Sequence, residues 1–175
     1  MRDRETLVAA LRERGVDYLT PTDAETDQPL DDESLIASLA AHPEARLRQA
    51  LLALFLLQPQ LAPLVPRLRE QLDFSAAHEL TAHYMAAVYL QRMWWIRLER
   101  YLPEYSELPD YFSAELGLPA RDDEHGKAGL YVLGDWHAAQ GPHRLNQLSA
   151  YQGVADLVLH SLKMKHRRRE PSPTG

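Results

Sequence analysis

The chain contains no cysteine among its 175 residues. Disulfide scaffolds, thiol catalysis and cysteine-ligated zinc are therefore excluded, and we expect a reducing, cytoplasmic location. The longest apolar stretch, Ala50 to Leu57, is far shorter than the ~20 residues that a membrane-spanning helix needs. The first residues mix charges of both signs, unlike the basic start of a secretion signal, so we expect no membrane contact.

Several sequence signatures of catalysis are also missing. The eight glycines are dispersed and form no phosphate-binding loop, and no serine lies in a Gly-x-Ser-x-Gly turn. His78 and His83 are five residues apart, which on a helix points their side chains roughly 140° apart, so they cannot grip one metal ion as in the zinc-protease motif. The carboxylates of residues 122–124 are consecutive and cannot all face one cation. We therefore expect no metal and no cofactor, and assign no catalytic residue.

Acidic residues outnumber basic ones over residues 1–162, and the balance reverses at the end of the chain. The net charge is −6, and residues 163–170 contribute +4, which leaves −10 on residues 1–162. An acidic body repels the phosphate backbone of nucleic acids. Nucleic-acid binding would therefore have to use the C-terminal basic segment, whose candidate residues are Lys163, Lys165, Arg167, Arg168 and Arg169.

What the chain does contain is many apolar residues at helical spacing. Apolar residues make up 45% of the sequence, and 175 residues suffice for one domain with its own core. The run from Leu47 to Leu57 is so apolar that other helices must surround it. No segment has the pattern of a strand. The sequence predicts an all-α, single-domain bundle of about six to eight helices around a long central helix over residues 75–101.

Cap and turn residues divide the chain into four parts. We expect an N-terminal helix in 1–19, a mobile acidic linker in 20–33, the core of the bundle in 34–166, and a basic, then Pro/Ser-rich disordered tail in 167–175. The expected helices cover 3–14, 32–41, 44–57, 63–72, 75–101, a short turn within 108–119, 127–139, and a last helix from between 145 and 150 to about 166. Gly129 and Gly134 are positions at which a neighbouring helix could approach closely.

The central helix is expected to begin at a Ser75 cap and to be apolar over more than half its circumference, with Ile96 facing inward. Four of its residues form a candidate interaction patch: Arg92, Trp94, Trp95 and Arg97. Adjacent side chains on a helix point ~100° apart, so the two indoles cannot face the same core wall. Either one tryptophan lies at an interface, or the helix buries both against different neighbours.

Acid–base pairs at helical spacing are the remaining candidates for chemistry. Glu79 and His83 share a helix face, as do Asp156 and His160. We interpret such pairs as hydrogen-bonded pairs of structural value. A hydrolase or transferase that uses four residues, Glu79, His83, Asp135 and His137, stays open as a further hypothesis.

Three segments, Leu90–Trp94, Leu108–Pro119 and Gly126–Leu130, resemble a group of small uncharacterised bacterial helical proteins. That group is linked with nucleotidyltransferase-like genes, as in toxin and antitoxin pairs. The resemblance covers residues 44–160, rests on packing and turn residues, and carries over no functional site. The nucleotidyltransferase signature itself, a Gly-Ser pair followed by paired aspartates on a strand, is absent. The resemblance implies a partner-binding role.

Taken together, these patterns favour a non-enzymatic protein–protein interaction module. Its partner would be another protein, for which the chain would act as an antitoxin-like subunit, or a second copy of the chain in a homo-oligomer. Nucleic-acid binding through the C-terminal basic segment is the alternative, and an uncharacterised hydrolase or transferase is the second alternative.

Overall fold

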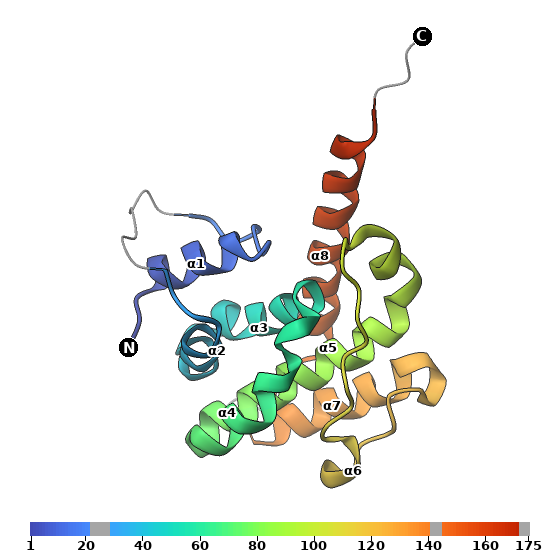
Figure 1. Ribbon diagram of the computed structural model, residues 1–175. Helices are drawn as coiled ribbons and strands as arrows, with labels where there is room; N and C mark the ends of the chain where they lie inside the picture. The colour runs from blue at the N-terminus through green and yellow to red at the C-terminus, as the bar shows by residue number, and fades with distance from the viewer. Residues whose placement is uncertain (22–28, 141–144, 172–175) are drawn as a thin grey trace.

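The computed structural model describes residues 1–21, 29–140 and 145–171 (Figure 1). Within these ranges all regular secondary structure is helical, which confirms the predicted all-α, single-domain bundle. The helices are α1 (Arg4–Glu13), α2 (Asp32–Ala41), α3 (Ala45–Leu57), the 3₁₀ helix η1 (Pro59–Leu64), α4 (Val65–Gln71), α5 (Phe74–Tyr101), α6 (Ser113–Leu116), the 3₁₀ helix η2 (Asp123–Gly126), α7 (Lys127–Ala139) and α8 (Leu148–Arg169).

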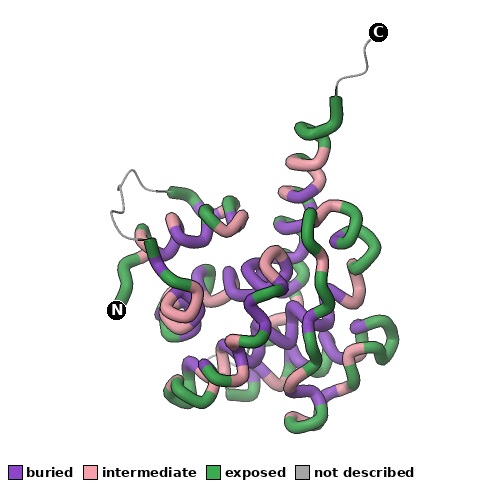
Figure 2. The backbone as a smooth tube through the Cα atoms, in the orientation of Figure 1, coloured by how far each residue is buried: buried purple, intermediate pink, exposed green. Residues whose placement is uncertain are grey.

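The apolar helix α3 lies in the interior of the bundle, in contact with α2, α5 and α8. Every residue from Ala50 to Leu56 is buried, so the helix is enclosed on all sides, as its composition predicts (Figure 2). Burial of each leucine or phenylalanine side chain contributes about 1.5–3 kcal/mol. The contacts of α3 and α5 therefore form the centre of the core.

Aspartate side chains cap three of the helices. Asp3, Asp31 and Asp73 have extended backbones, and each accepts a hydrogen bond from the backbone N–H three residues further on. The prediction that Ser75 caps the central helix is wrong, because Asp73 takes that position and Ser75 lies exposed in the first turn.

Prolines divide the segment that the sequence predicts as one helix over 63–72. The chain instead forms η1, which begins at Pro59 and contains Pro63, followed by α4, which has Pro66 in its first turn. Proline has no N–H to donate, so it fits the start of a helix and disrupts its interior. No helix in the described ranges is by itself long and apolar enough to cross a membrane. One pair of consecutive helical segments in these ranges, α3 and Pro59–Gln71, is long and apolar enough when taken together, but the chain bends by 116° between the two segments.

The long helix α5 is interrupted at Trp94, whose φ of −114° and ψ of 18° lie outside helical values. Before this kink every residue from Leu80 to Gln91 is buried, whereas after it only Leu98 is buried. Ile96, predicted to face inward, is 66% exposed. The kink turns the last two turns of α5 away from the direction that a regular helix would give them.

Helix α8 packs its first turns on α3 and α5 and then projects beyond the body of the molecule (Figure 1). It ends at Arg169, three residues after the predicted end, and the basic residues of its last turn complement the helix dipole. Residues 22–28 of the predicted acidic linker and 172–175 of the predicted tail lie outside the described residues.

Candidate functional site

The predicted interaction patch lies at the kink of α5. Trp94 is half-buried against the core, and the guanidinium of Arg97 lies over its ring, 5.6 Å from the centroid. Trp95 is 41% exposed and Arg97 is exposed. The two indoles therefore have different surroundings, and Trp95 is the one available to a partner.

A pocket of about 350 Å³, which we call the Trp95 pocket, lies beside these residues. It is lined by Arg92, Trp95, Glu99, Tyr105, Glu107 and Arg121. Its arginines already have carboxylate partners: Arg92 Nε lies 2.8 Å from Asp122 Oδ1, and Arg121 pairs with Glu107. Within the described residues Glu99 has no ion-pair partner. Burial raises the pKa of Tyr105, which keeps its hydroxyl protonated.

The C-terminal basic segment is partly used within the fold. Lys165 Nζ lies 3.0 Å from Asp17 Oδ2 and donates to the carbonyl of Gly15 at 3.3 Å, so this lysine ties α8 to the turn after α1. Lys163 is half-buried. Residues 167–169, all arginine, are exposed and make no ion pair with the described residues. These three arginines are the part of the segment that a partner can reach.

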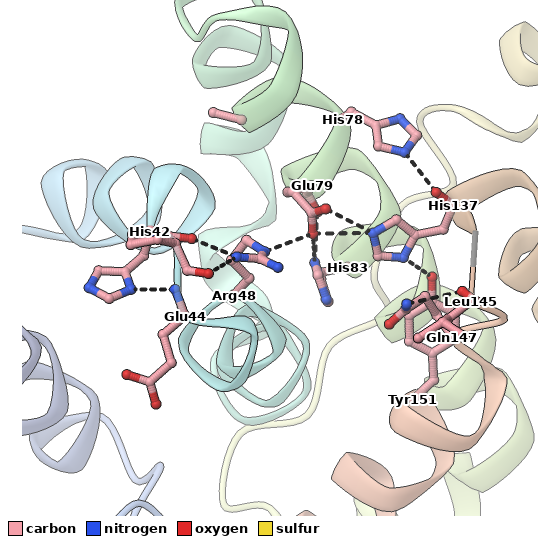
Figure 3. Close-up of polar contacts among 12 residues, drawn as sticks. His42, Glu44, Arg48, His78, Glu79, His83, His137, Leu145, Gln147 and Tyr151 are labelled. Atoms are coloured by element: carbon pink, nitrogen blue, oxygen red, sulfur yellow. Dashed lines mark hydrogen bonds and ion pairs between the residues drawn. The ribbon is translucent and has the colours of Figure 1, made fainter. Parts of the chain in front are cut away.

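The interior contains a polar cluster that joins four helices (Figure 3). It consists of Arg48 from α3, Glu79 and His83 from α5, His137 from α7 and Tyr151 from α8. His137 Nε2 lies 3.1 and 3.2 Å from the two carboxylate oxygens of Glu79, and His137 Nδ1 lies 2.5 Å from the Tyr151 hydroxyl. Arg48 Nε lies 3.4 Å from Glu79 Oε2 on the other side.

The chemistry of these groups fixes the direction of the hydrogen bonds in the neutral state of His137. The carboxylate of Glu79 can only accept, so His137 Nε2–H donates to it. Nδ1 then carries a lone pair and accepts from the Tyr151 O–H. Burial raises the pKa of Tyr151 and keeps this donor protonated.

Glu79 is half-buried yet ionised. Burial by itself would raise the pKa of its carboxyl group, but the His137 hydrogen bond and the nearby His83 and Arg48 outweigh burial and lower this pKa to about 2. The Arg48 guanidinium is held in place because it also donates to the carbonyl of His42 at 2.8 Å. The cluster therefore has a fixed negative charge with a fixed positive neighbour.

His83 is only 1% exposed and is incompletely hydrogen-bonded. Its Nδ1 lies 2.8 Å from the backbone carbonyl of Glu79, which can only accept, so Nδ1 carries the hydrogen. Nε2 then has a buried lone pair with no hydrogen-bond partner. Burial and the neighbouring His137 lower the pKa of His83 to about 4, so its ring is neutral at pH 7.

The sequence predicts part of this cluster. The Glu79 and His83 pair and His137 do come together, whereas Asp135 is exposed and accepts a hydrogen bond from Asn146 at 2.9 Å. Asp156 and His160 are both exposed on α8. The contributions of Arg48 and Tyr151 were missed, because no local pattern marks either residue.

The spacing of His78 and His83 predicts that their side chains point in different directions, and in the structure they do not converge on one point. His78 Nε2 lies 3.3 Å from the backbone carbonyl of His137, and the centroid of its ring lies 5.5 Å from that of His137 and 4.4 Å from that of Trp136. His78 is half-buried, and burial lowers its pKa. It contacts the cluster only through His137 and is not one of its members.

The cluster is poorly placed to act on a substrate. Tyr151 is fully buried and His137 is 5% exposed. The Trp95 pocket, a second pocket beside Asp135 and Asn146, and a third beside Arg69 and Phe112 are all lined by other residues. What the arrangement offers chemically is a carboxylate and two imidazoles that converge on a small volume.

Comparison with known proteins finds no match among protein-family models, curated proteins or solved structures.

Proposed function

We propose that the protein is a non-enzymatic interaction module that binds a protein chain at the Trp95 pocket. The observation that carries this proposal is the composition of the pocket: tryptophan, tyrosine and arginine side chains surround a hollow of about 350 Å³, and Trp95 is 41% exposed beside it. These three residue types dominate the binding energy of protein interfaces. Ile96, the next residue of α5, is 66% exposed.

The chemistry of the pocket favours a cationic side chain. Trp95 and Tyr105 both line the pocket, and aromatic rings attract ammonium and guanidinium groups. Glu99 supplies a carboxylate that is free of any ion pair with the described residues, while the pocket arginines are already neutralised by acidic neighbours. An arginine or lysine of the bound chain would thus meet two rings and a negative charge.

The occupant that we propose is the arginine run 167–169 of a second copy. These arginines are exposed, and their sequence neighbourhood carries +4 against −10 on residues 1–162. The rings of Tyr101 and His166 lie 5.1 Å apart, so the basic end of α8 and the end of α5 occupy the same side of the molecule. A two-fold arrangement can then place the arginines of each copy against the pocket of the other.

The test is the molar mass in solution, measured by size-exclusion chromatography with light scattering. We expect a dimer at low salt that dissociates as salt rises, because the contact pairs opposite charges. Trp95→Ala should shift the protein to the monomer. Tyr131→Ala, which removes a half-exposed aromatic of α7 outside the pocket, should leave the dimer intact. A wild-type monomer at all protein concentrations would overturn the proposal.

A triple Arg167→Ser, Arg168→Ser, Arg169→Ser variant tests the occupant. It should be monomeric with unchanged helix content, because these side chains make no ion pair with the described residues. A dimer that persists in this variant excludes the arginine run as the occupant. If the wild type is monomeric and binds nucleic acid, and the triple variant does not, the arginines belong to the nucleic-acid alternative instead.

A further inference from the structure

The polar cluster contains a set of metal-ligand atoms that sequence spacing alone does not predict. One atom each from Glu79, His83 and His137 lies within 4.8 Å of the other two. Glu79 and His83 are one turn apart on α5, and the third ligand comes from α7. We infer that these three side chains bind a divalent transition-metal ion, at a site separate from the Trp95 pocket.

The distances between the candidate ligand atoms fit a small ion. Metal–nitrogen and metal–oxygen bonds of about 2.0–2.1 Å in tetrahedral geometry separate neighbouring ligand atoms by about 3.3 Å. Measured from one oxygen of Glu79, Oε2, His137 Nε2 lies at 3.2 Å and His83 Nδ1 at 3.5 Å. Two edges of the coordination polyhedron are therefore close to their bound lengths before any ion enters.

Two of the three candidate ligands, His137 and Glu79, also have an outer partner, as metal ligands usually do. The Tyr151 hydroxyl lies 2.5 Å from His137 Nδ1 and fixes the orientation of that ring. Arg48 lies against the carboxylate of Glu79 and is itself anchored on the carbonyls of His42 and Pro43, at 2.8 and 2.6 Å. These contacts hold the ligands in place from outside the proposed coordination sphere.

Binding requires a change of tautomer in both imidazoles and no net loss of a proton. His137 moves its hydrogen from Nε2 to Nδ1, where the Tyr151 oxygen can accept it. His83 moves its hydrogen from Nδ1 to Nε2 and exchanges its bond to the Glu79 carbonyl for a bond to the metal. The ring of His83 has one unpartnered nitrogen, Nε2, both before and after this exchange.

The ligand set selects the class of ion. Two imidazoles and one carboxylate suit zinc, cobalt, nickel or copper, whereas magnesium and calcium prefer oxygen ligands alone. Three protein ligands leave one position for water. The side chain of Glu79 is 19% exposed, which gives water and ions a route to the site. Arg48 adds a positive charge nearby, so we expect an affinity below that of structural zinc sites.

The experiment is titration of the full-length protein with Co²⁺, followed by its visible absorption. We expect one Co²⁺ per chain, an absorption band typical of low coordination number, and displacement by Zn²⁺ but not by Mg²⁺. His83→Gln and His137→Gln should each weaken binding at least about 100-fold, and Tyr151→Phe about 10–100-fold through loss of the outer contact. His160→Gln, at an exposed histidine of α8, is the matched control and should bind like wild type.

A second measurement does not depend on the variants folding. In the unaltered, ¹⁵N-labelled protein, Zn²⁺ should shift the imidazole nitrogen signals of His83 and His137 and leave that of His160 unchanged. Absence of Co²⁺ and Zn²⁺ binding at micromolar concentrations, or binding that survives His83→Gln and His137→Gln in folded protein, would overturn the inference. Neither result bears on the proposed binding at the Trp95 pocket, because that proposal is tested by the molar mass of the protein in solution.

Discussion

Gly129 of α7 lies directly against the ring of Tyr89 of α5, so closely that a Cβ atom on Gly129 would be 2.0 Å from Tyr89 Cε1. The predicted close approach at this glycine is thereby confirmed. The ring cannot move aside cheaply, because the Tyr89 hydroxyl donates to the carbonyl of Pro119 at 2.7 Å. The packing of α7 on α5 therefore depends on the absence of a side chain at Gly129.

Gly129→Ala should therefore lower the free energy of unfolding by about 1–3 kcal/mol through overpacking. The matched control is Gly153→Ala on α8, where nothing lies within 4 Å of the added methyl group. That change should raise stability by up to about 1 kcal/mol, because alanine is the better helix former. Urea denaturation of both variants measures the difference. Equal effects of the two substitutions would contradict the assigned contact.

Two neighbouring residues at the start of α5 should respond differently to removal of their side chains. Asp73 accepts a hydrogen bond from the N–H of Ala76 at 2.9 Å, so Asp73→Ala should cost about 1 kcal/mol. Ser75 is exposed in the first turn, and Ser75→Ala should change stability by less than about 0.5 kcal/mol. Thermal unfolding monitored by circular dichroism distinguishes the two, and a larger loss for Ser75→Ala would be incompatible with Asp73 as the cap.

Two buried tyrosine hydroxyls differ in hydrogen bonding. The Tyr84 hydroxyl donates to the carbonyl of Pro109 at 2.6 Å, whereas the buried hydroxyl of Tyr18 has no partner among the described residues. Tyr84→Phe should cost about 1 kcal/mol, since it also leaves the carbonyl unpaired. Tyr18→Phe should be neutral or stabilising at pH 7. Burial raises the pKa of Tyr18 to about 12, so Tyr18→Phe should also reduce the stability lost between pH 10 and pH 12.

Stability should fall as pH is lowered from about 6.5 to about 4, measured with a chelator present. His83 has a folded-state pKa of about 4 against 6.5 when exposed, so in this window the unfolded chain binds a proton that the folded chain does not. Burial lowers the pKa of His78 as well, which acts in the same direction. Each of these two histidines lowers the free energy of unfolding by at most about 1.4 kcal/mol for each pH unit in this window.

His83→Leu is the control for this pH dependence, measured by urea denaturation at pH 7, 6 and 5. The variant should lose less stability over this range than wild type, because one of the responsible groups is gone. Below about pH 4.5 the protonation of Glu79, whose pKa is lowered to about 2, should reduce the stability of both proteins. If the free energy of unfolding changes equally with pH in both proteins between pH 6.5 and 5, His83 is not buried as a neutral ring.

The helices were predictable because each is specified by its own residues. The bounds of α2 and α7 coincide with those expected from cap, glycine and apolar spacing. The residue that caps α5 was not predictable, because Asp73 and Ser75 are both good cap residues and the sequence pattern does not choose between them. The kink at Trp94 has no local signal at all, because no proline or glycine lies nearby.

The polar cluster was predictable only where its members share a helix. Glu79 and His83 are four residues apart, so their pairing follows from helical geometry. Asp135 was wrongly joined to His137, because two residues on a helix correspond to about 200° of rotation and turn its carboxylate away. Tyr151 reaches His137 only through the packing of α8 on the bundle, which no spacing in one helix encodes.

The contacts from Arg48 through Glu79 and His137 to Tyr151 have a consequence for biosynthesis. The individual contacts span 31, 58 and 14 residues, and the one between Glu79 and His137 requires the longest stretch of intervening chain to be ordered first. A nascent chain that has not yet delivered α8 from the ribosome leaves the Nδ1 atom of His137 without its tyrosine. Arrival of the C-terminal helix therefore completes the interior.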